Sequence, residues 1–378
     1  MKQIKQFFEN LQREYASTYP GEKLFDDYER SALYVERLGS YLEARLKKQS
    51  RDIDAACVLV SVWFELREAD QACIAFLQNF QAEHQETLNA ADKARLHTNC
   101  AFYEAETYAC DPELFNAALQ LESPYWQTYL GLGLTQFSRY QMTRDAKALA
   151  LAKAGFLKQK ELRGDYLSHL NYAAALFAEA DYRGAKEQLY PWLESYPDRP
   201  RLLFALAQCE AKLQNPAAAR ELLSRVKVDE PSGYVLRSDE VSESCVADLY
   251  FELGDYGKYL EICREADLVS PWQELSPYLY AVLRSEGELV CQEVAAQLLE
   301  ELEAERAQLQ AECAHAESGA DSTAMEELAA ELVDIEAQMA ATRAALQGVL
   351  GAEEVCGPEL EFHPEAACYL VDCVRHSL

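Results

Sequence analysis

Residues 167–200 read LSHLNYAAALFAEADYRGAKEQLYPWLESYPDRP, and this stretch decides the fold. It holds two runs of apolar residues at helical spacing, separated by a short polar turn and closed by a proline. The order returns in residues 200–231, PRLLFALAQCEAKLQNPAAARELLSRVKVDEP, where Ala219 follows Ala185 by 34 residues. Two helices joined by a short turn and repeated at a fixed spacing predict a stack of helical hairpins.

A third copy of the pattern occupies residues 244–271, which read SCVADLYFELGDYGKYLEICREADLVSP. Its closing proline comes 40 residues after Pro231, so about six residues are inserted, and we place them in a loop over 232–240. Tyr259 stands where the first two copies have alanine in the second helix. The larger side chain predicts looser packing or a local shift in this copy.

This repeat resembles the tetratricopeptide repeat (TPR) family, in which each unit of about 34 residues is a helical hairpin. The resemblance spans residues 166–271 and extends in weaker form to 52–82 and 125–158. It implies an all-α fold, a TPR-like helical-hairpin solenoid. In this family small residues let the two helices of a unit approach closely, and the sequence has them at Ala173, Ala207, Ala247, Ala185 and Ala219.

In the family that the repeat resembles, the first helix of each unit lines a concave groove. The resemblance therefore implies a groove position for Asn171, Tyr172 and Gln208. Tyr250 is a further candidate for partner binding, because tyrosine is a preferred anchor residue in interfaces. The alternative for each residue is ordinary helix packing with a partly buried side chain.

The sequence changes character after Ser285. Residues 286–365 hold 20 acidic and two basic side chains, so most of the formal net charge of −29 lies there. Two long runs rich in Ala, Leu and Glu, about 288–316 and 323–349, predict helices, and apolar residues of the second recur at three- and four-residue spacing. This spacing predicts a protruding acidic antiparallel coiled-coil hairpin near the C-terminus. Its candidate partner-binding carboxylates are Glu300, Glu301, Glu326 and Glu327.

These features predict four parts in chain order: an N-terminal helical region with degenerate repeats, the TPR-like repeats, the acidic coiled-coil hairpin, and a loop with a C-terminal capping helix. We place them at residues 1–124, 125–285, 286–350 and 351–378. The capping helix is expected over 364–377. Its apolar face, which would cover an exposed end of the repeat stack, consists of Tyr369, Leu370, Cys373 and Val374.

No motif in the sequence predicts catalysis. The chain lacks a Gly-Lys-Ser/Thr phosphate loop, a Gly-x-Ser-x-Gly elbow and a His-Glu-x-x-His helix. We therefore expect neither an enzyme nor a cofactor. Gly131 and Gly133 lie close together, but close helix packing accounts for them better than nucleotide binding.

The nearest approach to a metal motif is formed by Cys368, Cys373 and His376, with Cys356 and His363 upstream. Structural zinc sites usually use pairs of cysteines two to four residues apart, and the spacing here is different. Cys373 also fits the apolar face of the expected last helix. The sequence therefore favours a capping helix and predicts no metal site.

The net charge of −29 disfavours direct binding to nucleic acid or to an anionic membrane surface. The N-terminus lacks the apolar run of a signal peptide, and no segment is long and apolar enough to span a bilayer. The scattered cysteines fit helix cores better than a disulfide framework. The expected location is cytoplasmic.

The main hypothesis is a non-catalytic protein that masks or escorts a basic protein partner, as an immunity protein, antitoxin or chaperone does. The alternative is a TPR adaptor or scaffold that binds peptides of a larger assembly in its concave groove. A homodimer is a further option, because residues 139–163 carry a local charge of +5 that an acidic hairpin of a second copy would complement.

Overall fold

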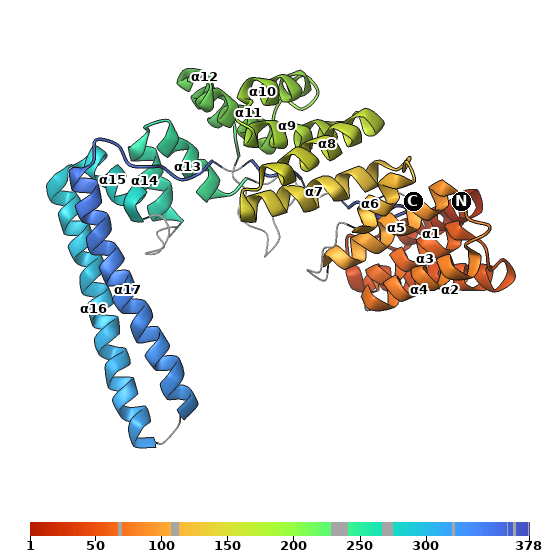
Figure 1. The fold of residues 1–378 in the computed structure, drawn as a ribbon, viewed down its shortest axis with the longest axis horizontal. Helices are drawn as coiled ribbons and strands as arrows, with labels where there is room; N and C mark the ends of the chain where they lie inside the picture. The colour runs from red at the N-terminus through yellow and green to blue at the C-terminus, as the bar shows by residue number, and fades with distance from the viewer. Residues whose placement is uncertain are drawn as a thin grey trace. The chain divides into compact units, whose positions relative to one another are not determined.

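The structure is a computed structural model, and it describes residues 1–66, 70–106, 113–227, 241–266, 275–319, 322–360, 362–365, 368–376 and 378. Every regular element in this part of the chain is a helix, which confirms the predicted all-α class (Figure 1). The chain forms two compact units: Met1–Leu189 together with His363–Leu378, and Tyr190–Phe362. The expected boundaries after residues 124, 285 and 350 do not coincide with this division.

The first unit is built from helices that pack against their neighbours in the chain, such as α7 along α8 and α9 along α10 (Figure 1). Apolar residues at helical spacing decide which face of each helix is buried: in α1 these are Ile4, Phe8, Leu11 and Tyr15. The helices are α1 (Lys2–Thr18), α2 (Tyr28–Lys48), α3 (Ile53–Glu65), α4 (Asp70–His84), α5 (Ala90–Glu106), α6 (Glu113–Gln120), α7 (Trp126–Thr143), α8 (Ala146–Arg163), α9 (Tyr166–Ala178) and α10 (Tyr182–Leu189).

The second unit begins with a short 3-10 helix and continues in the same hairpin style. Its last two helices are much longer than the others. The elements are η1 (Tyr190–Leu193), α11 (Pro200–Lys212), α12 (Pro216–Leu223), α13 (Glu243–Glu252), α14 (Tyr256–Glu265), α15 (Leu275–Glu286), α16 (Glu288–Gly319) and α17 (Ser322–Gly351). No helix in the described residues of either unit combines the length and the apolarity that crossing a bilayer requires.

The three predicted repeats are helical hairpins, formed by α9–α10, α11–α12 and α13–α14. The turn of each hairpin places one residue in the left-handed region: Ala180 (φ 63°), Gln214 (φ 62°) and Gly254 (φ 72°). The next residue in each turn donates its backbone N–H to a carbonyl five residues earlier, which ends the first helix. These residues recur at the same 34- and 40-residue spacing as the sequence repeat.

Tyr259 corrects one expectation about the third hairpin. Its side chain is fully buried, and its ring lies edge-on to Phe251 with centroids 5.3 Å apart, so the prediction of looser packing is wrong. The tyrosine fills space beside α13 that alanine would leave empty. The predicted insertion over 232–240 lies outside the described residues.

Three glycines let helices approach closely: Gly131 faces α6, while Gly133 and Gly155 lie between α7 and α8, and the sequence predicts this role for Gly131 and Gly133. A Cβ at Gly131 would lie 2.5 Å from the Phe115 ring, and one at Gly133 would lie 2.4 Å from the Phe156 ring. On the facing helix, a Cβ at Gly155 would lie 2.9 Å from the backbone oxygen of Tyr129. Helix packing therefore accounts for this glycine pattern.

Replacing Gly155 by alanine is expected to destabilise the first unit by about 1–3 kcal/mol, because a backbone oxygen cannot move aside as a side chain can. Urea unfolding followed by circular dichroism measures the change. Gly348→Ala in α17 is the matched control, since nothing lies within 4 Å of its Cβ position. In a helix, this control gains stability. A Gly155→Ala protein as stable as the parent would contradict the close approach.

The acidic region forms two long helices, α16 and α17, near the predicted positions. They run side by side in opposite directions (Figure 1). Between them lies a small apolar cluster of Leu302, Leu309, Ile335 and Met339. Other helices of the second unit pack at the base of the pair, around Cys291, Ala295 and Val349. The assignment of this pair as a coiled coil stays a prediction.

The predicted capping helix over 364–377 is wrong for the described residues. The last helix ends at Gly351, and the described residues that follow are extended or form turns. Three of their backbone N–H groups bind side chains of helices instead of carbonyls four residues earlier. We call residues 363–378 the C-terminal segment; it belongs to the first unit.

Candidate functional site

The C-terminal segment lies against the first helices of successive hairpins in the first unit, where the blue end of the chain reaches the red and orange helices (Figure 1). Three polar side chains accept hydrogen bonds from its backbone. Asn171 in α9 binds the N–H of Glu365 at 2.7 Å. Asn99 in α5 binds Val371 at 2.8 Å, and Ser61 in α3 binds Val374 at 2.8 Å. The segment thus passes along the hairpins in the reverse of their chain order.

A buried arginine joins this segment to two helices. Arg95 in α5 is 6% exposed and forms ion pairs with Asp372 of the segment and with Asp54 of α3. The N-terminal amine also contacts Asp54. Burial raises the pKa of Asp54, but hydrogen bonds from the N-terminal amine and Arg95 outweigh this effect and hold that pKa below its ordinary value. For Asp372 burial dominates, and the pKa is raised.

Apolar side chains complete the contact. The Tyr369 ring packs edge-on to Phe102, with centroids 5.1 Å apart, and lies 5.9 Å from the Phe115 ring. Leu370 is fully buried, and Val374 belongs to the apolar core formed with α1, α2 and α3. The segment is therefore part of the folded core of the first unit.

Asn171 is fully buried in α9, and its amide oxygen already accepts a hydrogen bond from the protein's own chain. Tyr172 is half-buried, and the ammonium group of Lys160 lies 4.4 Å from the centre of its ring. Tyr250 packs at the edge of the apolar cluster of α13 to α17. Neither tyrosine is brought to the C-terminal segment by a described contact.

In the second unit, Gln208 lines a cavity of about 640 Å³. Cys245 and Asp248 of α13 and Ser276 of α15 form other parts of its wall, and residues 356–360 close one side. Gln208 is itself almost fully buried. Its predicted groove position therefore corresponds to a hollow next to an extended stretch of the same chain.

The paired helices α16 and α17 carry a strongly acidic surface. Residues 288–351 hold 14 acidic side chains and two arginines, Arg306 and Arg343. Glu300 and Glu301 are exposed, as predicted. Glu326 and Glu327 belong to α17, but their side chains lie outside those that the structure describes.

The basic stretch at residues 139–163 is neutralised in part by carboxylates of its own unit. Lys153 pairs with Glu179, and Lys158 pairs with Glu161 at 2.9 Å. Arg163 pairs with Asp165 at 2.5 Å, and its guanidinium lies over the Trp126 ring. Glu161 is already counted in the local charge of +5, so the pairs with Glu179 and Asp165 lower that charge to +3.

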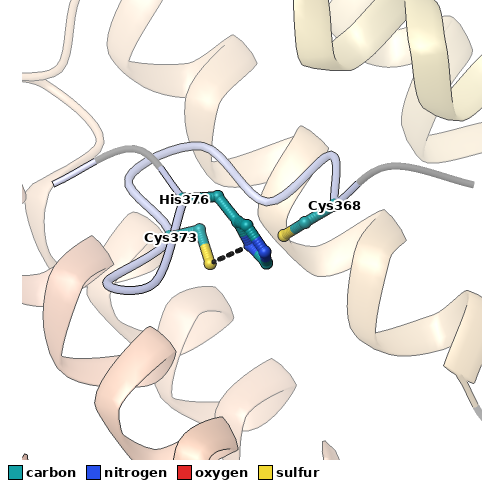
Figure 2. Close-up of side chains that lie close together, drawn as sticks. All are labelled: Cys368, Cys373 and His376. Carbon is teal, nitrogen blue, oxygen red and sulfur yellow. Dashed lines mark hydrogen bonds between the residues drawn. The ribbon is translucent and has the colours of Figure 1, made fainter. Parts of the chain in front are cut away.

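The side chains of Cys368, Cys373 and His376 meet at the end of the C-terminal segment, and all three point toward one another (Figure 2). The Cys373 sulfur lies 3.3 Å from Nδ1 of His376. The other two residues of the predicted group lie elsewhere: His363 contacts Gln141 at 2.7 Å, and Cys356 lines the cavity of the second unit.

The thiols of this group have opposite tendencies to ionise. A hydrogen bond from Cys368 is the largest influence that lowers the pKa of Cys373, and His376 lowers it further against the effect of burial. The same sharing of a proton raises the pKa of Cys368, which burial raises as well. The contact with Cys373 raises the pKa of His376.

One segment of the chain matches a known protein family. Residues 176–235 match the sequence model of a family described as tetratricopeptide repeat. No curated protein matches the chain.

Three solved structures resemble the chain at low identity. A tetratricopeptide repeat protein from Parabacteroides merdae is 12% identical and has a TM-score of 0.38, with 70% of this chain and 93% of that one covered. Yeast Tom70 is 12% identical with a TM-score of 0.35, covering 85% and 61%. A human IFIT1 dimer with m7Gppp-AAAA is 16% identical with a TM-score of 0.30, covering 93% and 78%.

Proposed function

We propose that the protein is a non-catalytic adaptor that binds a basic protein partner through the exposed carboxylates of α16 and α17. The observation that carries the proposal is the acidic surface of this pair, where ten carboxylate side chains among those described between residues 288 and 351 are exposed, against two arginines. A surface of one sign attracts a partner of the other sign and raises the rate of encounter. Masking or escorting such a partner, as an immunity protein, antitoxin or chaperone does, is the form of adaptor that this surface suits.

Two further observations support a protein partner and this surface. Residues 176–235 match a repeat whose members bind proteins, which supports an adaptor or scaffold role. In the first unit, Asn171, Asn99 and Ser61 already bind the chain's own C-terminal segment. Partner binding through these three side chains would require that segment to leave, whereas Glu300 and Glu301 are exposed as the protein stands.

The experiment is a pull-down from source-cell lysate with tagged full-length protein, at low and high salt, read by mass spectrometry. We expect a dominant basic protein that is retained at low salt and lost at high salt, since the Debye length falls from about 10 Å at 0.1 M to about 3 Å at 1 M. The double substitution Glu300→Gln and Glu301→Gln is expected to weaken capture.

A matched control separates this surface from the general negative charge. Glu36→Gln with Glu43→Gln removes two exposed carboxylates from α2 and is expected to leave capture unchanged. Equal weakening by both double variants would contradict a role for α16 and α17. Capture of untagged copies of the chain would instead identify a homodimer.

The cavity beside Gln208 favours a second candidate function, the binding of an extended peptide by the second unit. In the pull-down this function predicts several proteins that resist high salt, because apolar and backbone contacts are weakly screened. Gln208→Leu would reduce their capture, while Glu300→Gln with Glu301→Gln would leave it intact. A salt-sensitive set unaffected by Gln208→Leu would exclude this function.

A further inference from the structure

We propose that Cys368, Cys373 and His376 form a binding site for a thiophilic divalent cation of the zinc class. The three ligand atoms come from nine consecutive residues and lie within 4.8 Å of one another (Figure 2). Two sulfurs and an imidazole nitrogen are ligands that favour zinc or cobalt over magnesium or calcium.

The separations suit one small tetrahedral ion. With metal–sulfur bonds of about 2.3 Å and metal–nitrogen bonds of about 2.0–2.1 Å, ligand atoms in a tetrahedral site lie about 3.5–3.8 Å apart. The distance of 3.3 Å between the Cys373 sulfur and His376 Nδ1 is close to this range, and no pair exceeds 4.8 Å. Small side-chain rotations are enough to form the site.

The backbone around Cys373 differs from the helix that made a metal site unexpected. A helix would have used Cys373 as one residue of an apolar face, but the described residues here form turns. The turns direct Cys368, Cys373 and His376 to a common point across spacings of five and three residues. Ligand spacing in the sequence is therefore a poor guide at this site, because the loop supplies the geometry.

Burial and ionisation also suit metal binding. Cys373 is buried, Cys368 is half-buried and His376 is exposed, so an ion would enter from the histidine side and keep a fourth position for water. Zinc-class ions bind the thiolate, which is the ligand form of cysteine. On binding, both thiols give their protons to solvent and His376 ligates as neutral imidazole, so affinity falls as pH falls.

The ion would fix the last turn of the C-terminal segment onto the first unit. The residue after Cys373, Val374, donates its backbone N–H to Ser61, and Arg375 pairs with Glu65 of α3 at 2.7 Å. Cys373 and His376 flank these two residues in the sequence. Binding to the folded state alone therefore raises stability with metal concentration.

The test uses full-length protein that has been reduced with a phosphine and freed of metal with a chelator. Cobalt(II) is added, and the thiolate-to-cobalt charge-transfer band and the visible bands of tetrahedral cobalt are recorded. We expect one equivalent to bind to this site and zinc to displace it. Loss of a residue that only hydrogen-bonds to a metal ligand weakens metal binding roughly 10–100-fold. Cys368→Ser and His376→Ala each remove a ligand, so we expect each to weaken cobalt binding by more than this.

Cys356→Ser is the matched control, because this cysteine is exposed and lies outside the group. It is expected to bind cobalt as the parent does. Circular dichroism checks that each variant is folded. Cys368, which is half-buried, and His376, which is exposed, are substituted because replacement of the buried Cys373 would leave a cavity. The proposal is overturned if the reduced parent binds no cobalt or if the bands survive in both ligand variants.

Discussion

Replacing Tyr369 by alanine is expected to lower the free energy of unfolding of the first unit by about 3–5 kcal/mol. The ring is 8% exposed and packs against Phe102 and Phe115 of two different helices. Its removal leaves a cavity that rigid helices fill only in part. Urea unfolding of the full chain, with hydrogen exchange to locate the loss in α5 and α6, measures the effect.

Tyr369→Phe is the control for this substitution, since it keeps the ring and removes only the hydroxyl. We expect its free energy of unfolding to fall by much less, within the roughly 0.5–1.5 kcal/mol that one hydrogen bond contributes. If Tyr369→Ala is as stable as the parent, the C-terminal segment is not part of the core of the first unit. Rapid proteolysis of this segment in the parent would lead to the same conclusion.

Replacing Arg95 by alanine is expected to cost about 3–5 kcal/mol at neutral pH, because Asp54 and Asp372 are left without their buried cationic partner. Arg95 is almost fully buried, and Asp372 is its contact on the C-terminal segment. Thermal or urea unfolding of the full chain across a pH series measures the loss.

The sign of the pH dependence follows from the two carboxyl groups. In the parent, the pKa of Asp54 is lowered, so its contribution to stability is present above its unfolded pKa and is lost as pH falls. The pKa of Asp372 is raised by burial, so its ionisation opposes folding as pH rises. Without Arg95 the folded pKa of Asp54 rises from its lowered value, and the folded pKa of Asp372 rises further. The deficit of the variant is therefore largest near neutral pH and shrinks as pH falls toward the ordinary aspartate pKa of about 3.9.

Two comparisons isolate the buried pair. Arg37→Ala removes an exposed arginine that pairs with Glu14, and we expect little change because solvent screens this pair. Adding Asp372→Asn to Arg95→Ala is expected to recover part of the loss, because it removes an uncompensated charge from the interior. A loss that is the same at every pH, or that Asp372→Asn does not relieve, would argue against this explanation.

The hairpin repeat could be predicted because its determinants are local. Residues such as Ala185 and Ala219 mark sites of close helix contact, and Gly254 marks a turn with positive φ. The close packing of α7 on its neighbours could likewise be predicted from Gly131, which faces α6, and Gly133, which faces α8. Tyr259 shows the limit of this reasoning, because the space available to a side chain depends on neighbours that the repeat pattern does not specify.

The candidate sites were predicted only in part. Asn171 and Gln208 were placed on inner helix faces, and they lie beside extended parts of the same chain. Asn99, Ser61 and Arg95 were missed, although all three are buried polar residues and Ser61 interrupts the apolar run of α3. Such residues need a partner inside the protein, so their positions were the available signal.

The sequence alone determined the all-α class, the hairpin spacing and the concentration of acidic charge in α16 and α17, because these depend on residues close together in the chain. Tertiary structure decided the course of the C-terminal segment. Its apolar residues suit a helix face or an extended contact, and local spacing cannot choose between them. Bonds to Asn99 and Ser61, 272 and 313 residues earlier, satisfy its backbone without a helix and bring Cys368, Cys373 and His376 together.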